Sequence, residues 1–283
     1  MKFTRLFVFA LIAAIAAIGV STLSSRAADC TRTVITEEDI TRQAENTPPT
    51  DNWVLYTRGA GTGAFHTGPA TPPSGVGSLE TITPTGADKV FLFNYDHVGT
   101  KLADIDKLGY ATYRVSGASP NQVPAINIQV DINGGTLNAG EFTTLVFEPV
   151  YNTNQGAIVD GQWQTWDAYN GGNAIWWSSR AIPGVCASDC FVTWNQILAS
   201  NPNATIVGGF GINQGSGNPA LTASSDVLTI GSNGDCITYD FEPFRVAATR
   251  DDCKNGGYNN VKDAQGNPFK NQGQCIQFVN TGK

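Results

Sequence analysis

The stretch AINIQVDIN, residues 125–133, alternates apolar and polar side chains without interruption. Its apolar members are Ile126, Ile128, Val130 and Ile132, and its polar members are Asn127, Gln129, Asp131 and Asn133. A period of two predicts a β-strand that turns one face to a dry core and the other to water. Asn133 is followed by two glycines, which favours a hairpin because asparagine and glycine tolerate positive φ. The stretch therefore predicts an antiparallel sheet that is packed on one side.

Short runs rich in β-branched and aromatic residues recur on both sides of this stretch, separated by Gly, Asn, Pro and Ser. They cover residues 89–97, 108–115, 142–151, 204–212, 226–230 and 236–243. Only residues 36–45 and residues 191–200 favour short helices. In the second segment, Trp194, Ile197 and Leu198 share one helical face. The pattern predicts an all-β fold, a two-sheet antiparallel β-sandwich of the jelly-roll type.

Residues 1–27 have the layout of a secretory signal peptide. Lys2 and Arg5 precede an apolar run from Leu6 to Val20, and small residues stand near the expected cleavage point. The run is shorter than the ~20 residues that a membrane-spanning helix needs. We therefore expect a cleaved, secreted protein without a membrane partner. The remaining chain divides into an N-terminal arm (28–50), a β-sandwich domain (51–248) and a small C-terminal module (249–283).

The chain is acidic, with 17 Lys and Arg residues against 24 Asp and Glu residues and a net charge of −7. Loss of the basic signal peptide makes the mature protein more acidic still. Nucleic acids and anionic membranes attract basic surfaces, so this charge argues against both as partners. The sequence leaves the oligomeric state open.

An even number of cysteines, six, remains after cleavage, which in an exported chain indicates disulfides. Proximity along the chain favours the pairs Cys186–Cys190 and Cys253–Cys275, which leaves Cys30–Cys236 as the third. A zinc site at the closely spaced pair is the alternative. Only His66 and His97 are available as histidine ligands, and no second cysteine pair has matching spacing, so we favour disulfides.

Four of the six tryptophans lie in residues 161–179, at positions Trp163, Trp166, Trp176 and Trp177. Residues an odd number apart on a strand point to opposite faces, so each pair sends one indole inward and one outward. Trp177 shares a face with Ile175 and is our choice for the core, which places Trp176 outside. The pattern does not decide between Trp163 and Trp166.

An exposed indole suits the apolar face of a sugar, because the ring is flat and carries a polar N–H. The wet face of residues 125–133 adds hydrogen-bonding groups, as a shallow carbohydrate site requires. The candidate binding residues are Trp163, Trp166, Trp176, Tyr169, Asn127, Gln129 and Asp131. The alternative is that loops or the C-terminal module cover the exposed indoles. We assign no catalytic residues.

Calcium is the one metal that the sequence suggests. Asp131 and Asp226, together with loop carbonyls, offer the hard oxygen ligands that calcium prefers. Their spacing matches no EF-hand loop, so any calcium would have a structural role. We expect no other cofactor.

Several motifs resemble secreted bacterial β-sandwich domains of the concanavalin-like and carbohydrate-binding jelly-roll class. They are KLADIDKLGYATYRV (101–115) followed by AINIQVDI, and VGGFGINQGSG (207–217) with SDVLTIGS (225–232). The tail CKNGGYNNV…FKNQGQCIQFV is similar to a short module at the ends of exported bacterial proteins. The resemblance implies a sandwich fold and a polysaccharide or cell-wall glycan as partner.

Enzymes of this architecture carry paired carboxylates in an E-x-D-x-x-E-like run, which this sequence lacks. Lyases of similar fold use Arg, His, Gln and Tyr, and Arg114, His97, Gln129 and Tyr151 supply these types without a motif that joins them. We therefore expect a secreted, non-enzymatic protein that binds extracellular carbohydrate. The alternatives are a glycan-degrading hydrolase or lyase and a structural protein of the cell surface or matrix.

Overall fold

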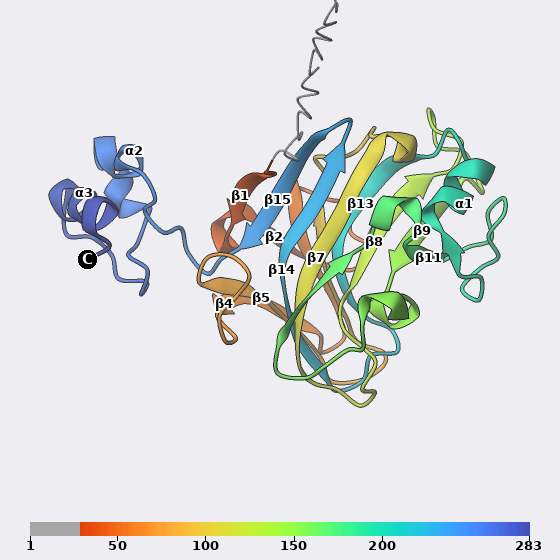
Figure 1. The fold of residues 1–283 in the computed structure, drawn as a ribbon, viewed down its shortest axis with the longest axis horizontal. Coiled ribbons are helices and arrows are strands. Elements are labelled where there is room, and N and C mark those ends of the chain that lie inside the picture. The colour runs from red at the N-terminus through yellow and green to blue at the C-terminus, as the bar shows by residue number, and fades with distance from the viewer. Residues whose placement is uncertain (1–28) are drawn as a thin grey trace, which may run out of the picture.

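The computed structural model describes residues 29–283, and the expected signal peptide lies outside the described residues. The strands form two sheets that lie face to face as a β-sandwich (Figure 1). A small helical module follows the last strand and stands to one side of the sandwich (Figure 1). The all-β fold and the two-sheet architecture expected from the sequence are confirmed.

One sheet has seven strands arranged around β14. Its main path is β1 (Thr31–Ile35), β15 (Asp235–Phe241), β14 (Leu221–Ser232), β5 (Gly77–Thr83) and β4 (Thr62–Thr67). In addition, β7 (Ile105–Ser116) pairs with β14, and β10 (Trp163–Asp167) pairs with β7.

The other sheet has eight strands in a single path. In order they are β12 (Val192–Thr193), β11 (Ile175–Ser178), β9 (Phe142–Phe147), β8 (Ala125–Asp131), β13 (Thr205–Gly215), β6 (Lys89–Asn94), β3 (Trp53–Arg58) and β2 (Thr41–Ala44). The helices are α1 (Trp194–Ser200), α2 (Arg250–Cys253) and α3 (Gln272–Thr281), with 3₁₀ turns at Glu37–Asp39, Leu102–Asp104, Pro149–Tyr151, Thr153–Gln155, Asn170–Gly172 and Lys254–Asn259.

The N-terminal arm adds an edge strand to each sheet, which its polar composition does not indicate. β1 pairs parallel with β15 and β2 pairs parallel with β3, whereas the other strand pairs are antiparallel. The helix expected at residues 36–45 is wrong, because only Glu37–Asp39 forms a 3₁₀ turn and Thr41–Ala44 joins β3. Hydrogen bonds to an open sheet edge outweigh the weak helical preference of so short a segment.

The core lies between the sheets and uses alternate residues of each strand. Ile126, Ile128 and Val130 of β8 are fully buried, as the period of two predicts. The helix expected at residues 191–200 forms α1, whose Trp194 is buried in the same core.

Three disulfides join the cysteine pairs expected from the sequence, Cys30–Cys236, Cys186–Cys190 and Cys253–Cys275. The first connects the residue before β1 to β15, its partner strand. A cross-link between segments so distant in sequence restricts the unfolded chain and thereby favours the folded state. It also holds the arm at the sheet edge.

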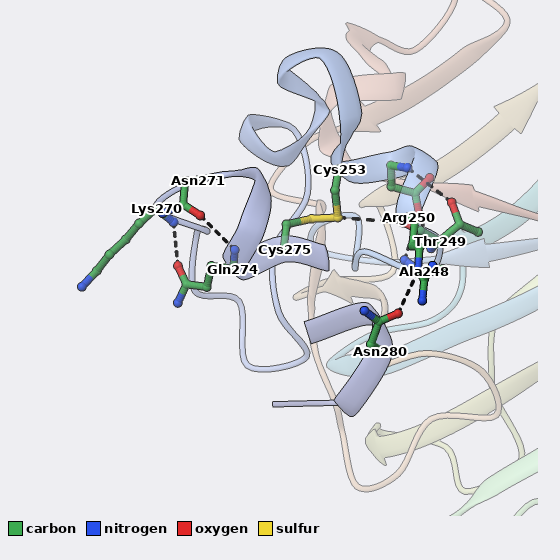
Figure 2. The surroundings of a disulfide bond; sticks show 10 residues. Ala248, Thr249, Arg250, Cys253, Lys270, Asn271, Gln274, Cys275 and Asn280 are labelled. Atoms are coloured by element: carbon green, nitrogen blue, oxygen red, sulfur yellow. Dashed lines mark hydrogen bonds between the residues drawn. A yellow bond between two sulfur atoms is a disulfide. The ribbon is translucent and has the colours of Figure 1, made fainter. Parts of the chain in front are cut away.

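Residues 249–283 form a module around its own disulfide (Figure 2). Its buried apolar cluster consists of Ala247, Cys253, Val261, Phe269 and Cys275. The side chain of Asn271 caps α3 by accepting a hydrogen bond from Gln274 N–H (Figure 2). A segment of this size buries little apolar surface, so the Cys253–Cys275 bond supplies a constraint that the small core cannot.

Three carboxyl groups gather on the outer side of the seven-stranded sheet, namely Asp226, Asp240 and Glu242. All three side chains are buried, and Arg32 forms an ion pair with Asp240. Glu242 accepts a hydrogen bond from Val76 N–H at 2.8 Å, which ties the β4–β5 loop to the cluster. Burial, together with the charge of Asp240, raises the pKa of Asp226 to about 8. Burial also raises the pKa of Glu242 to about 7.

These shifts predict a loss of stability as the pH rises from about 4 to about 8. In this range the folded protein retains a proton at the Asp226 carboxyl that the unfolded chain has released, so a lower pH favours folding. One such proton changes the free energy of unfolding by about 1.4 kcal/mol per pH unit. We expect Asp226→Asn to reduce this slope in urea unfolding series, and Asp51→Asn, at an exposed position, to leave it unchanged. If the free energy of unfolding changed with pH at the same slope in the original protein and in both variants, the raised pKa of Asp226 would be contradicted.

Candidate binding groove

A hollow of about 680 Å³, here called the groove, crosses the outer face of the eight-stranded sheet. Its lining comes from β3, β6, β13, β8 and β9, which are neighbours in the sheet. Neighbouring strands lie about 4.8 Å apart, so the four intervals between these five strands make the groove roughly 19 Å long across the sheet. The loop of residues 45–49 borders the groove beside β3.

One wall of the groove is aromatic and comes from β6 and β3. Phe91 and Phe93 stand on the outer face, with ring centroids 4.9 Å apart, and Tyr95 continues their line. Tyr56 of β3 stacks on Phe91 at 4.9 Å, and its hydroxyl lies 2.9 Å from that of Tyr95. Tyr56, Phe91 and Phe93 pack together as a small buried cluster, and Tyr95 covers it as the partly exposed ring of the wall.

The opposite wall carries the amide side chains of β8. Asn127 and Gln129 both line the groove. The Oε1 atom of Gln129 accepts a hydrogen bond from Gly209 N–H at 2.8 Å, which fixes this side chain. The Oδ1 atom of Asn127 is buried and has no hydrogen-bond partner in the described protein. A buried acceptor without a partner is unfavourable, so Asn127 is suited to receive a donor from a ligand.

Glycines in the middle of β13 form the floor between the two walls. The strand register places Gly211 between Phe93 of β6 and Asn127 of β8. A Cβ atom added at Gly211 would lie 1.9 Å from the carbonyl oxygen of Leu92, so a larger residue would displace β6. Gly208 lines the groove directly. Neighbouring side chains lie over these glycines, because a Cβ atom at Gly208 would lie 2.2 Å from Gln129 Oε1 and one at Gly209 would lie 2.3 Å from Cδ2 of Phe93. The glycines therefore let the two walls approach each other across β13.

The charged groups beside the groove are paired with each other. Glu45 lies 2.9 Å from Arg58 and 3.3 Å from Lys89. The ammonium group of Lys89 also lies over the Phe91 ring, 4.7 Å from its centroid. Burial raises the pKa of the Tyr95 phenol, which therefore stays neutral. The groove thus offers aromatic rings and uncharged hydrogen-bonding groups side by side.

The structure places two of the seven expected binding residues in the groove, Asn127 and Gln129. Asp131, on the same strand, is fully buried and accepts a hydrogen bond from Asn133 N–H at 3.0 Å. It does not line the groove, so its expected place on a wet face is wrong. Tyr169 packs against the core.

Each tryptophan pair sends one indole inward, as expected, but the choice made at β11 is wrong. Trp176 is fully buried, and its Nε1 donates to the Ala168 carbonyl at 2.9 Å. Trp177 lies on the outer face, and its Nε1 donates to Glu148 at 2.8 Å. The pairing of β11 with β9 determines which indole faces the core, because it puts Trp176 opposite the core residue Phe147.

The other tryptophan pair is divided between the core and the opposite sheet. Trp166 is 1% exposed and donates to the Thr112 hydroxyl at 2.8 Å, so this candidate binding residue lies in the core and Trp163 is the outward member of the pair. Trp163 is partly exposed on the seven-stranded sheet, where it contacts Tyr113 and donates to the Pro69 carbonyl at 2.9 Å. None of the tryptophans is among the lining residues of the groove.

The two calcium candidates lie in different sheets, Asp131 on β8 and Asp226 on β14. Asp226 accepts hydrogen bonds from Phe241 N–H and Ser74 N–H instead. In residues 29–283, no three His, Cys, Asp or Glu side chains converge as metal ligands. The side-chain positions therefore give no support to a calcium site built on these two residues.

The aromatic wall is the part of the site that the sequence analysis missed. Residues 89–97 were expected to form a strand, and β6 does so, but its outer face was not considered. The available signal is that Phe91 and Phe93 alternate with Val90 and Leu92, so both faces of β6 are apolar. Such a strand needs a cover on its second side, and Phe91 and Phe93 are buried there with Val54 and Tyr56 of β3.

Comparisons with protein-family models, curated proteins and solved structures give no match to this chain. Across residues 29–283, none of the helices is long and apolar enough to cross a membrane. The geometry of the groove is therefore the basis on which a function can be assigned.

The positions of the two neighbouring tryptophans predict losses of stability of different size. We expect Trp176→Ala to lower the free energy of unfolding by about 3 to 5 kcal/mol, because it leaves a cavity in the core. Trp177→Ala removes a partly exposed ring and should cost less, about 1 to 2 kcal/mol. Chemical denaturation of both variants measures the difference. The reverse order would return Trp177 to the core.

Proposed function

We propose that this chain is an exported, non-enzymatic protein that binds an extracellular or cell-wall glycan in the groove. One observation carries the proposal: an aromatic wall and an amide wall lie on either side of β13 in a groove of about 680 Å³. The three disulfides fit an oxidising, extracellular environment.

The groove matches the chemistry of a sugar ring. A pyranose has apolar C–H faces, which pack on aromatic rings, and a rim of hydroxyl groups, which need hydrogen-bond partners. Tyr95 supplies a partly exposed ring backed by the buried Phe93, and Asn127 and Gln129 supply amides on the other side. A sugar hydroxyl can also donate to the Oδ1 atom of Asn127, which has no partner in the described protein.

The charges at the groove favour binding without catalysis. Glycoside hydrolysis requires two carboxyl groups on either side of the scissile bond. The one carboxylate among the groove's lining residues is Glu45, and it is held by Arg58 and Lys89. Glu45 therefore lacks both a partner acid and the freedom to accept a proton from water.

Binding of residues 29–283 to a panel of soluble and insoluble polysaccharides tests the proposal. We expect retention on at least one glycan, without release of reducing ends or unsaturated products. Asn127→Ala and Tyr95→Ala should each raise the dissociation constant by up to about tenfold, because each removes one contact to the sugar. Thermal unfolding of both variants checks that the sandwich is intact.

Two substitutions serve as matched controls. Tyr95→Phe keeps the ring and should bind nearly as well as the original protein, and Trp163→Phe, on the opposite sheet, should have no effect. No retention on any glycan would refute the proposal. Release of products would favour a degrading enzyme, and self-association that is indifferent to sugars would favour a structural protein.

A further inference from the structure

The outer face of the eight-stranded sheet continues beyond the groove to β11. On this side the last lining residues are Phe142 and Thr144 of β9. β11 lies next to β9 (Figure 1). Trp177 is opposite Val146, and the backbone of Ser179 donates to the Thr144 carbonyl at 2.9 Å. Trp177 therefore lies on the face that carries the groove, one strand beyond its edge.

One row of the sheet links the groove to this indole. Asn127, Val146 and Trp177 are successive partners on β8, β9 and β11. Two spacings of about 4.8 Å place Trp177 about 10 Å from Asn127. The indole is partly exposed, and its hydrogen bond to Glu148 at 2.8 Å fixes the ring. A flat apolar surface thus continues the line of the groove.

Tyr151 and Phe191 form an exposed aromatic pair near the same glutamate. Their ring centroids are 4.0 Å apart, and each side chain is 43% exposed. The backbone N–H of Tyr151 donates to the Glu148 carbonyl at 3.2 Å, and the Glu148 side chain accepts from the Trp177 indole, so one residue joins both rings. We call Trp177, Tyr151 and Phe191 the aromatic platform.

Local bonds hold the platform in position. The side chain of Asn152 donates to the Ile175 carbonyl at 2.9 Å and accepts from its N–H at 2.7 Å, which ties the turn carrying Tyr151 to β11. The disulfide-closed loop of residues 186–190 ends directly before Phe191. Rings that are already fixed lose little conformational entropy when a ligand covers them.

We infer that the aromatic platform is a second contact site for the same ligand, and that this ligand is an extended glycan chain lying across the sheet. The inference rests on the proposed function of the groove. From Tyr56 on β3 to Trp177 on β11 the face crosses six neighbouring strands, or roughly 24 Å. A short sugar therefore occupies only one of the two parts, and a longer chain reaches both.

The surface between the two parts fits a glycan better than a segment of another protein. Thr144 and Ser179 lie there, and both carry hydroxyl groups, one of which accepts a hydrogen bond from Thr144 N–H at 3.0 Å. Alternating aromatic and hydroxyl surfaces suit a chain that itself alternates apolar ring faces and hydroxyl groups. A docked apolar peptide would leave these polar groups without partners.

Calorimetric titration with oligosaccharides of increasing length, cut from whichever polysaccharide is retained, tests the inference. For the original protein we expect affinity to rise with length and then level off. The double variant Tyr151→Ala/Phe191→Ala should bind the shortest oligosaccharides equally well and the longest ones about tenfold more weakly. Tyr95→Ala, in the groove, should weaken binding at every length.

The outcomes separate the inference from the proposed function. If short oligosaccharides bind and length has no effect, or if the double variant binds the long ones normally, the platform is not a glycan contact and the groove proposal survives. If no oligosaccharide binds, both are refuted. Thermal unfolding of the double variant should be unchanged because both rings are exposed, and a lowered midpoint would assign the pair a structural role instead.

Discussion

The apolar layer shared by the two sheets is the constraint on which the rest of the structure depends. Each strand gives alternate side chains to this layer, so all remaining side chains are placed on one of two outer faces. On β6 and β8, the layer takes Leu92 and Ile128, and Phe93 and Asn127 lie on the opposite side of the sheet. There Phe93 joins Val54, Tyr56 and Phe91 in a second, smaller buried cluster, which forms the base of the aromatic wall.

The two outer faces differ in which parts of the chain contact them. On the seven-stranded sheet, the β4–β5 loop bonds to the buried carboxyl groups of Asp226 and Glu242, and its Pro69 accepts the indole N–H of Trp163. These contacts cover part of that face, where Trp163 stays partly exposed. The eight-stranded sheet has the groove, and no residue of the C-terminal module lines it.

Sequence reasoning recovered what depends on local pattern or on chain proximity. The alternation in residues 125–133 gave the buried and outer faces of β8, and cysteine spacing gave the three disulfides. Sequence reasoning failed where the pairing of distant segments determines which residues are buried and which strands are neighbours. The apolar neighbour Ile175 suggested that Trp177 is buried, but the register with β9 buries Trp176. The edge strands of the arm and the neighbouring positions of β6, β13 and β8 likewise follow from pairing between distant segments.

Departures from ordinary sheet composition nevertheless mark the site. Glycine weakens a strand interior, yet Gly208 and Gly211 lie in a central strand of the sheet. Aromatic rings are uncommon on the outer face of a sandwich, yet Phe93 stands beside Gly211, and Asn127, on the other side, has an amide oxygen without a partner. The glycines and the unpaired amide oxygen each lower stability, whereas Phe93 is buried beside Phe91. Their convergence in one row of three strands is the kind of local departure that sequence rules associate with functional positions.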